Sequence, residues 1–326
     1  MKAVICRELG PPEKLVWDEA ESRPVGPAEV RLEVHAAGVN FPDTLIIQGK
    51  YQFKPQPPFT PGGEVSGIVR EVGAKVQHVR AGDHAVSVSA WGGYAQETVV
   101  PGDSVVPVPN DLDLTLAAAF PMTYGTTIHA LKQRAGLKAG ETLLVLGAAG
   151  GVGLSAVQVG KAMGAKVIAA ASTDEKLELC HANGADETIN YSDGDLKSKV
   201  KALTGGKGAD VIYDPVGGEL FQQCLSCVNW NGRILVIGFA AGDIPEIAAN
   251  RILLKGAAVV GVFWGAFVAR EPRVNAENFE QLMSWFGEGR IKPHIGKTYP
   301  MSRAAEALND MMGRKVQGKA VLLPDA

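Results

Sequence analysis

The sequence predicts an α/β protein with a doubly wound parallel sheet, preceded by a mostly β domain. Two observations carry this prediction. Between Glu141 and Ser172, an apolar run of strand length is followed by a glycine-rich turn, a helical pattern and a second apolar run. Beyond that unit, strand-like and helical patterns alternate as far as residue 264. Such alternation favours parallel strands that are joined by helices.

The first 120 residues read as mostly β. Alternating patterns predict strands at Val30–Val34, Glu64–Val72 and His84–Ser89, and glycine and proline punctuate the segments between them. Short strands at this spacing are typical of a small barrel or sandwich. From Leu116 the pattern becomes helical, is broken by a proline and ends at Gly136.

The glycine turn predicts a dinucleotide site. Ala148 stands where the usual GxGxxG spacing requires the first glycine, so the turn is identified by its context of strand, helix and second strand. Thr142–Leu146 forms the first strand and Lys166–Ala171 the second. We expect a pyrophosphate to bind main-chain N–H groups at the helix N-terminus. The residues expected at this position are Gly150, Gly151, Val152 and Gly153.

Further elements follow in alternation. The predicted helices are 174–181, 196–203, 218–228, 276–287 and 303–312. The predicted strands are 185–191, 209–213, 233–239, 258–264, 294–299 and 319–323. Cys224 and Cys227 are interpreted as two small buried residues one helical turn apart, because no second cysteine pair completes a zinc site.

The bulk composition limits the possible functions. The 326 residues are 46% hydrophobic, enough for about two domains with a sizeable core. The net charge of −3 gives no indication of nucleic-acid or anionic-membrane binding. The first ten residues mix acidic and basic side chains without a long apolar core. We expect a cytoplasmic protein without nucleic-acid or membrane partners.

Four motifs resemble one protein family over nearly the whole chain: AGVNFPD at 37–43, PFTPGGEVSG at 58–67, AAGGVG at 148–153 and QGKAVLLP at 317–324. They are similar to the zinc-free quinone oxidoreductase branch of the medium-chain dehydrogenase/reductase superfamily, which includes zeta-crystallin. The resemblance implies a Rossmann domain at residues 122–264. It also implies a GroES-like barrel domain, made discontinuously from residues 1–121 and 265–326.

The same resemblance implies a reaction without a catalytic metal. In the zinc alcohol dehydrogenases of the superfamily, a cysteine occupies the place of Asn40, and a His–Glu pair occupies the place of Gly63 and Glu64. A catalytic zinc needs about three protein ligands, and Glu64 alone cannot hold it. We therefore expect no metal site.

The phosphate end of the nucleotide site favours NADPH. The acids Asp174 and Glu175 come after the end of the second strand, where they are suited to open a helix. Ser172 and Lys176 are placed to hold a 2′-phosphate instead. The resemblance adds two further residues at that phosphate, Tyr191 and Arg314.

The resemblance also indicates which residues approach the nicotinamide. They are Asn40, Thr126, Phe239, Ala240, Ala241, Phe263, Trp264 and Gly265. Phe263 and Trp264 could equally serve packing. Tyr51 resembles the acidic tyrosine of related enoyl-thioester reductases, and its phenol is protonated at neutral pH. It could hydrogen-bond a substrate carbonyl or donate a proton, while Asn40 could orient a substrate oxygen or hold a ribose.

These observations predict an NADPH-dependent reductase that delivers hydride to a quinone or a related conjugated carbonyl. One alternative is reduction of the carbon–carbon double bond in enones, 2-alkenals or enoyl thioesters. An alternative of another class is a non-catalytic crystallin-like or RNA-binding protein.

The sixth strand predicts a homodimer. Ala257–Val262 is apolar and contains no lysine or proline that would block edge pairing. Related quinone oxidoreductases dimerise through this strand, so we expect an interface centred on residues 250–264.

Overall fold

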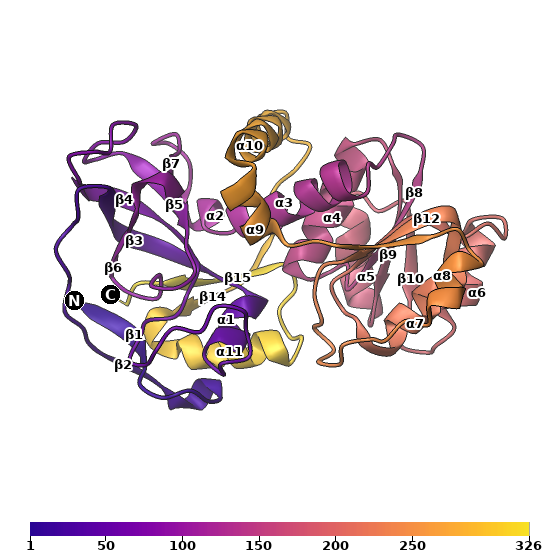
Figure 1. Cartoon of the computed structure of the whole chain (residues 1–326), viewed down its shortest axis with the longest axis horizontal. Coiled ribbons are helices and arrows are strands. Elements are labelled where there is room, and N and C mark those ends of the chain that lie inside the picture. The colour runs from indigo at the N-terminus through magenta and orange to yellow at the C-terminus, as the bar shows by residue number, and fades with distance from the viewer. Residues whose placement is uncertain (326) are drawn as a thin grey trace. The chain divides into compact units, whose positions relative to one another are not determined.

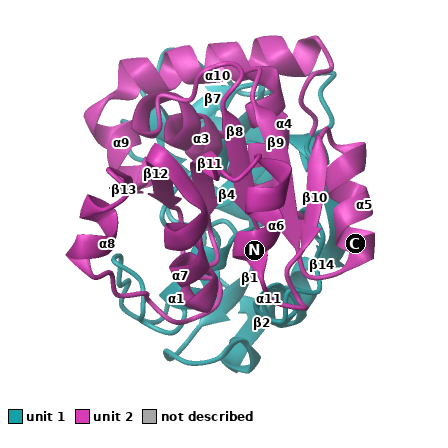
Figure 2. Cartoon of the chain, turned by 90° about the vertical axis from the view of Figure 1, so that its right-hand side faces the viewer, with its two compact units in different colours: residues 1–122, 293–326 teal, residues 123–292 magenta. Residues whose placement is uncertain are grey.

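The computed structural model describes residues 1–325, which form two compact units (Figure 2). Unit 1 comprises residues 1–122 together with the chain from residue 293 onward, and unit 2 comprises residues 123–292. The first boundary therefore lies one residue from its predicted position.

The second boundary differs from the prediction. Residues 265–292 were expected to belong to the first domain, but they pack within unit 2. Two helices account for the difference, α9 (Trp264–Arg270) and α10 (Pro272–Gly287). The indole of Trp264 lies against Gly125, and Asn278 exchanges side-chain hydrogen bonds with Gln133 at 2.9 and 3.1 Å. These contacts tie both helices to the helical segment that opens unit 2.

Unit 2 is built on a six-stranded parallel sheet (Figure 1). Its strands are β8 (Thr142–Leu146), β9 (Lys166–Ala171), β10 (Glu187–Asn190), β11 (Ala209–Asp214), β12 (Val228–Val236) and β13 (Ala258–Gly261). The order across the sheet is β10-β9-β8-β11-β12-β13, and each neighbouring pair is parallel. The order reverses beside β8, which is the arrangement of a doubly wound dinucleotide-binding sheet. The predicted fold class is therefore confirmed.

Helices connect these strands: α4 (Gly151–Ala162), α5 (Asp174–Ala182), α6 (Leu196–Leu203), α7 (Gly218–Cys227) and α8 (Ala249–Leu253). α4 contacts β8 and β9, whereas α7 contacts β11 and β12. Right-handed crossovers place α4 and α5 on one face of the sheet and α6 and α7, which contact each other, on the opposite face. The sheet thus has helices on both faces, in keeping with its apolar strands. Cys224 and Cys227 are both buried in α7, as predicted.

A helical segment opens unit 2. α3 (Pro121–Ile128) begins at the proline that interrupts the predicted helix, and it continues into a π-helical turn at His129–Arg134. The segment before that proline is the separate short helix α2 (Leu114–Ala117).

Unit 1 is mostly β. Its strands are β1 (Lys2–Cys6), β2 (Leu15–Glu19), β3 (Glu29–Val39), β4 (Glu64–Val72), β5 (His84–Val88), β6 (Glu97–Pro101), β7 (Val105–Pro107), β14 (Ile295–Pro300) and β15 (Lys319–Leu323). β1 and β2 form a two-stranded sheet. The other seven form one sheet in the order β14-β15-β3-β4-β5-β7, with β6 paired to β3. In Figure 1 the yellow C-terminal strands lie with the violet N-terminal ones, because β15 pairs antiparallel with β3.

Two helices cover part of unit 1, α1 (Phe41–Ile46) and α11 (Ala304–Met312), and they contact each other. Beneath them lies an apolar core in which the Tyr94 side chain is fully buried. Short 3-10 turns occupy Pro12–Lys14, Gly102–Ser104 and Met301–Arg303. No helix among residues 1–325 is long and apolar enough to cross a bilayer.

Candidate active site

The glycine turn between β8 and α4 leaves little room for side chains. Gly147 adopts a φ of 55°, a conformation that favours glycine. A Cβ atom on Gly153 would lie 2.2 Å from the carbonyl oxygen of Gly147, whereas one on Gly150 would meet only that oxygen, at 3.4 Å. Gly153 therefore allows α4 to approach the turn. The N–H groups of the first helical turn lack intrahelical acceptors and favour an anion.

The loops that follow β11 and β12 are joined to each other. The buried carboxylate of Asp214 accepts hydrogen bonds from the N–H groups of Val216 at 2.8 Å and Gly217 at 2.9 Å. Burial raises the pKa of Asp214, and these two N–H groups partly offset that rise. The N–H of Ala241 donates to the Val216 carbonyl at 2.9 Å, and Phe239 lies against Gly217. The predicted residues after β12 are thus fixed by the loop after β11.

Trp264 and Phe263 differ in exposure. Trp264 is buried, its Nε1 donates to Oδ1 of Asn275 at 3.1 Å, and its ring lies so close to Gly125 that a Cβ there would stand 2.6 Å away. Trp264 is therefore engaged in packing, and its predicted approach to the nicotinamide stays a prediction. Phe263 is 45% exposed and the neighbouring α3 residue Thr126 is half-buried, so both remain accessible.

A buried hydroxyl chain links α3 to the glycine turn. Thr127 Oγ1 lies 2.7 Å from Ser155 Oγ and 3.0 Å from the Tyr213 hydroxyl. Ser155 Oγ donates to the carbonyl of Val152 in the first turn of α4, at 3.0 Å. This chain fixes the helix that carries Thr126, and the sequence patterns did not indicate it.

The predicted phosphate site lies at one edge of the sheet. Ser172 follows β9 and Tyr191 follows β10, and the two strands are paired to their ends. Lys176 lies in the first turn of α5. Asp174, one of two acids in that turn, accepts a hydrogen bond from Asn190 Nδ2 at 2.9 Å and opens the helix. The carboxylate is thus engaged within the protein, and the roles of Ser172, Lys176 and Tyr191 at a ligand phosphate stay predictions.

Tyr51 and Arg314 were predicted from unit 1. Tyr51 is half-buried against the apolar core, with its ring 5.8 Å from that of Phe53. Burial, with a smaller contribution from the charge of Asp43, raises the pKa of the Tyr51 phenol, so it is protonated at neutral pH. Arg314 follows α11 with a φ of 55°. Their roles as site residues stay predictions.

Asn40 belongs to a buried polar cluster that the sequence did not reveal. The ammonium of Lys319 donates to Glu64 Oε2 at 2.6 Å and to Asn40 Oδ1 at 2.5 Å. Asn40 Nδ2 donates to the same Glu64 oxygen at 3.0 Å, and the N–H of Met122 donates to Glu64 Oε1 at 2.7 Å. Glu64 is 0% and Lys319 3% exposed. A salt bridge buried to this degree is stabilised by further hydrogen bonds to its charged groups, and both Glu64 oxygens and the Lys319 ammonium make them.

A second carboxylate adjoins this cluster. Asp43 is buried, and its Oδ2 accepts from the N–H of Asn40 at 2.8 Å and from the Tyr94 hydroxyl at 2.7 Å. Burial raises the pKa of Asp43 to about 6, although both donors and the charge of Lys319 lower it. Asp43 thus orients the loop that carries Asn40.

The donor set of the cluster does not suit a metal ion. The oxygens of Glu64 are engaged by Lys319, Asn40 and Met122. At Gly63, a Cβ atom would lie 2.8 Å from the carbonyl oxygen of Ser89, so a larger residue requires a backbone shift. Within residues 1–325, no three His, Cys, Asp or Glu side chains are grouped to hold a metal.

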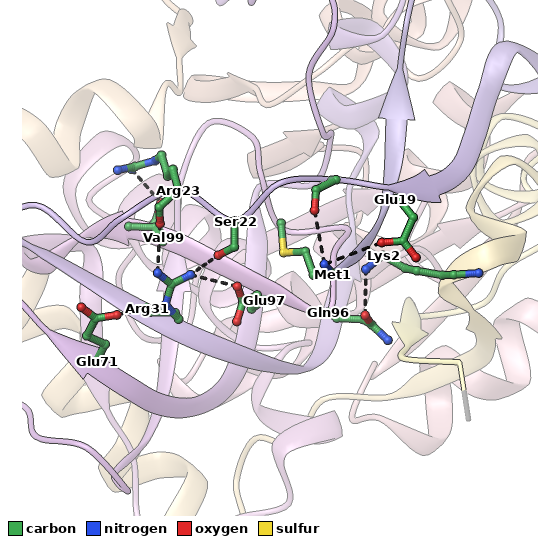
Figure 3. A network of polar contacts seen from close by, with 11 residues as sticks. Met1, Lys2, Glu19, Ser22, Arg23, Arg31, Glu71, Gln96, Glu97 and Val99 are labelled. Carbon is green, nitrogen blue, oxygen red and sulfur yellow. Dashed lines mark hydrogen bonds and ion pairs between the residues drawn. The ribbon is translucent and has the colours of Figure 1, made fainter.

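Unit 1 also has a surface cavity of about 640 Å³, lined in part by Met1, Gln96 and Glu97. Figure 3 shows that polar groups around it already have partners. Arg31 donates to Glu97 at 2.9 Å, and Gln96 accepts from the N–H of Lys2 at 2.8 Å. We assign no ligand to this cavity, because Gln96 and Glu97 already hydrogen-bond to residues of neighbouring strands.

Unit 2 has a dinucleotide-type sheet with a glycine turn, and the mostly β unit 1 contains a buried polar cluster. This combination is typical of oxidoreductases that use a dinucleotide cofactor. Two family models match the chain: an alcohol dehydrogenase GroES-like domain at residues 26–110 and a zinc-binding dehydrogenase domain at residues 151–288.

Relatives cover nearly the whole chain. The quinone oxidoreductase-like protein 2 homolog of Nematostella vectensis is 43% identical over 98% of this chain and 88% of the relative. The quinone oxidoreductase of Mus musculus is 35% identical over 99% of this chain and 98% of its own length. The chain belongs to the zinc-free quinone oxidoreductase family of medium-chain dehydrogenases/reductases, as its motifs predicted.

Solved structures agree with this assignment. Escherichia coli quinone oxidoreductase complexed with NADPH has a TM-score of 0.92 at 31% identity, covering 99% of this chain and 100% of that chain. A mycobacterial protein complexed with NADPH has a TM-score of 0.94 at 32% identity, with the same coverage. The enoyl reductase CurK has a TM-score of 0.89 at 25% identity, covering 99% of each chain.

Proposed function

We propose that this protein is an NADPH-dependent, metal-independent oxidoreductase that transfers hydride to quinones or related conjugated carbonyl compounds. The observation that carries the proposal is the buried cluster around Glu64. Its carboxylate is neutralised by Lys319 at 2.6 Å, so a cation already stands beside the acid, and both of its oxygens accept hydrogen bonds within the protein.

NADPH, when bound, supplies the hydride. The proposed pyrophosphate site is formed by the N–H groups at the start of α4, where Gly150 leaves the main chain open to a ligand. Ser172, Lys176 and Tyr191 would hold the 2′-phosphate. This choice rests on Lys176, whose ammonium supplies a positive charge in the first turn of α5. The NADPH complexes of two structural neighbours support it independently.

Tyr51 is the proposed acid or hydrogen-bond donor toward the acceptor. Its raised phenol pKa keeps the proton in place at neutral pH. A quinone accepts hydride to form a stabilised hydroquinone anion, which solvent can protonate, whereas an enolate intermediate gains more from a positioned donor. Thr126, Phe239 and Phe263 are proposed to contact the nicotinamide.

Quinones are the first choice of acceptor because the relatives that match the whole length of the chain are named quinone oxidoreductases. A second candidate is the reduction of a conjugated carbon–carbon double bond. The likeness to the enoyl reductase CurK and the protonated phenol of Tyr51 favour it.

The test is NADPH consumption by purified protein with a quinone, an enone, a 2-alkenal and an enoyl thioester, before and after treatment with a chelator. We expect the quinone to be reduced fastest and the chelator to have no effect. Preference for the enone or thioester would select the second candidate. Consumption with none of them would favour a non-catalytic role, and loss of activity on chelation would refute metal independence.

We further propose a homodimer formed through β13. This strand ends the sheet and pairs only with β12 among the described strands. Beside it, Leu253 is 77% and Leu254 75% exposed. An apolar edge of this kind is a hazard unless it is paired or covered, and two copies of the same edge can pair isologously. A cytoplasmic location stays a prediction.

A further inference from the structure

The side-chain amide of Asn40 can adopt only one orientation. A lysine ammonium has hydrogens to donate but no lone pair, so the atom that faces Lys319 at 2.5 Å must be the amide oxygen. The amide nitrogen then faces two acceptors, Glu64 Oε2 at 3.0 Å and the carbonyl of Gly38 at 3.2 Å. A flipped amide would place a donor against the ammonium and an acceptor against both oxygens.

This orientation fixes what Asn40 can offer a ligand. An amide has two N–H hydrogens and two oxygen lone pairs. Both hydrogens are used by Glu64 and Gly38, and one lone pair is used by Lys319. The remaining capacity is one acceptor position. A group that binds there must donate a hydrogen, which a hydroxyl can do and the carbonyl of a quinone or enone cannot.

We propose that Lys319 is a positioning residue that makes Asn40 an acceptor for a hydroxyl group of the bound ligand. The inference rests on the proposed function and decides between two roles that the sequence left open for Asn40. It opposes a hydrogen bond to the carbonyl of the oxidised acceptor. The hydroxyl has two sources, the nicotinamide ribose of NADPH and the hydroxyl of a hydroquinone product.

The surrounding backbone is built around this ammonium. A Cβ atom on Gly38 would lie 2.5 Å from Glu64 Oε2, 3.0 Å from Lys319 Cε and 2.4 Å from the carbonyl oxygen of Ala118. Glycine at this position therefore gives the lysine stem and the carboxylate their space. Because Lys319 is 3% exposed, its proximity to Asn40 is a feature of the packed interior.

The test separates orientation from stability. Lys319→Met alone leaves the Glu64 carboxylate buried without its cation, so we expect a large fall in melting temperature. The double variant Glu64→Gln/Lys319→Met removes both charges, and we expect it to recover much of that fall. In the double variant the amide oxygen at position 64 accepts from the N–H of Met122, so the amide nitrogen faces Asn40 and opposes its wild-type orientation, which only the carbonyl of Gly38 still favours.

Affinity is then measured by fluorescence titration with NADPH and with analogues that lack the 2′- or the 3′-hydroxyl of the nicotinamide ribose. For the second source, a hydroquinone and its dimethyl ether are compared as product inhibitors. In the wild type, loss of the relevant hydroxyl should weaken binding about fivefold to tenfold, equivalent to one hydrogen bond. In the double variant the same loss should change binding by less than about twofold.

The matched control is Glu141→Gln/Arg233→Met, which removes a partly buried ion pair of unit 2 with a 2.7 Å contact. It should lower stability and leave the hydroxyl discrimination of the wild type intact. Equal responses of wild type and Glu64→Gln/Lys319→Met to every hydroxyl deletion would overturn this inference alone. Failure of the wild type to bind NADPH would overturn the proposed function and this inference with it.

Discussion

Two alanine substitutions in the glycine turn should have different effects. At Gly153 the new methyl group would stand 2.2 Å from the carbonyl oxygen of Gly147 and 2.7 Å from the Cα of Ala148. Both are backbone atoms, so helix and turn must separate. At Gly150 the methyl group would meet only the Gly147 oxygen, at an ordinary 3.4 Å, and the backbone φ of −81° suits alanine.

The magnitudes follow from these contacts. Forcing two packed backbone segments apart costs about 3 kcal/mol. The better helix propensity of alanine offsets about 1 kcal/mol, which leaves Gly153→Ala about 2 kcal/mol less stable, a fall of about 4–8 °C in melting temperature. Gly150→Ala replaces a helix N-cap glycine and should cost less than about 1 kcal/mol. Its methyl group instead occupies the space proposed for the pyrophosphate, so NADPH affinity should fall at least about tenfold, or 1.4 kcal/mol.

The assays are thermal unfolding and fluorescence titration with NADPH, performed on both variants and the wild type. Gly150→Ala is the informative protein, because it should lose affinity while it keeps its stability. A Gly150→Ala protein that binds NADPH normally would refute the proposed pyrophosphate position. A Gly153→Ala protein as stable as the wild type would show that the turn relaxes more easily than the 2.2 Å contact implies.

Four further predictions follow from the site and the sheet edge. We expect NADPH to bind at least about tenfold more tightly than NADH, and Lys176→Ala to shrink that ratio because a 2′-phosphate contact is lost; an unchanged ratio in titration argues against the phosphate site. If Tyr51 is the acid, Tyr51→Phe should lower turnover of an enone or enoyl thioester about 10²–10⁴-fold with little change in NADPH affinity, and unchanged turnover would leave solvent as the proton source, which suffices for a quinone. Burial of Asp43 raises its folded-state pKa to about 6, so this group binds its proton more tightly in the native state. Its contribution to the free energy of unfolding therefore falls by about 3 kcal/mol as the pH rises from about 4 to about 6. Asp43→Asn should flatten that part of the plot of unfolding free energy against pH, and an unchanged slope would mean that other groups cause it. Val260→Lys should convert the proposed dimer to a monomer with a mass near the 34.3 kDa chain value in light scattering. Val106→Lys, at an exposed valine of unit 1, should leave the dimer intact. A wild-type mass near the chain value would contradict the dimer.

Several elements could be predicted to the residue because their ends are marked by glycine or polar residues. The strands β4, β8, β9 and β15 and the helix α6 have the predicted bounds. β12 was placed five residues too late, because its first half, Val228–Gly232, contains asparagines and a glycine that resemble a turn. It ends at Val236, and β13 ends at Gly261, so both stop three residues before their predicted ends. The ends of these strands are set by pairing with neighbouring strands, which the sequence of a single segment does not show.

The domain division failed at one point for a similar reason. The amphipathic pattern of α10 shows that the helix has an apolar face, and it says nothing about which unit covers that face. Hydrogen bonds between Asn278 and Gln133, which are far apart in the sequence, place it in unit 2. The individual helix was therefore predictable and its partner was not.

The cluster around Glu64 shows what a residue-by-residue comparison with metal-binding relatives leaves out. Such a comparison notes Asn40 and Gly63 where ligands are expected, and it treats Glu64 as a remaining ligand without partners. The structure adds Lys319, 255 positions later in the chain, in direct contact with that acid. A lysine inside the apolar strand KAVLL is itself a signal, because a buried ammonium requires a buried acceptor.

Placing a cysteine at position 40 and a histidine at position 63 would therefore not be enough to build a metal site. A histidine at position 63 would begin with a Cβ atom 2.8 Å from a backbone oxygen, which requires the turn to move. A metal ion near Glu64 would also meet the Lys319 ammonium, and at a separation of about 4 Å two like charges repel by several kcal/mol in a protein interior. The lysine therefore supports two features at once: it neutralises the acid without a metal, and it directs the Asn40 amide so that only its oxygen remains for a ligand. A change at Lys319 should alter both together, whereas a change at Asn40 should alter ligand binding and leave the neutralised carboxylate in place.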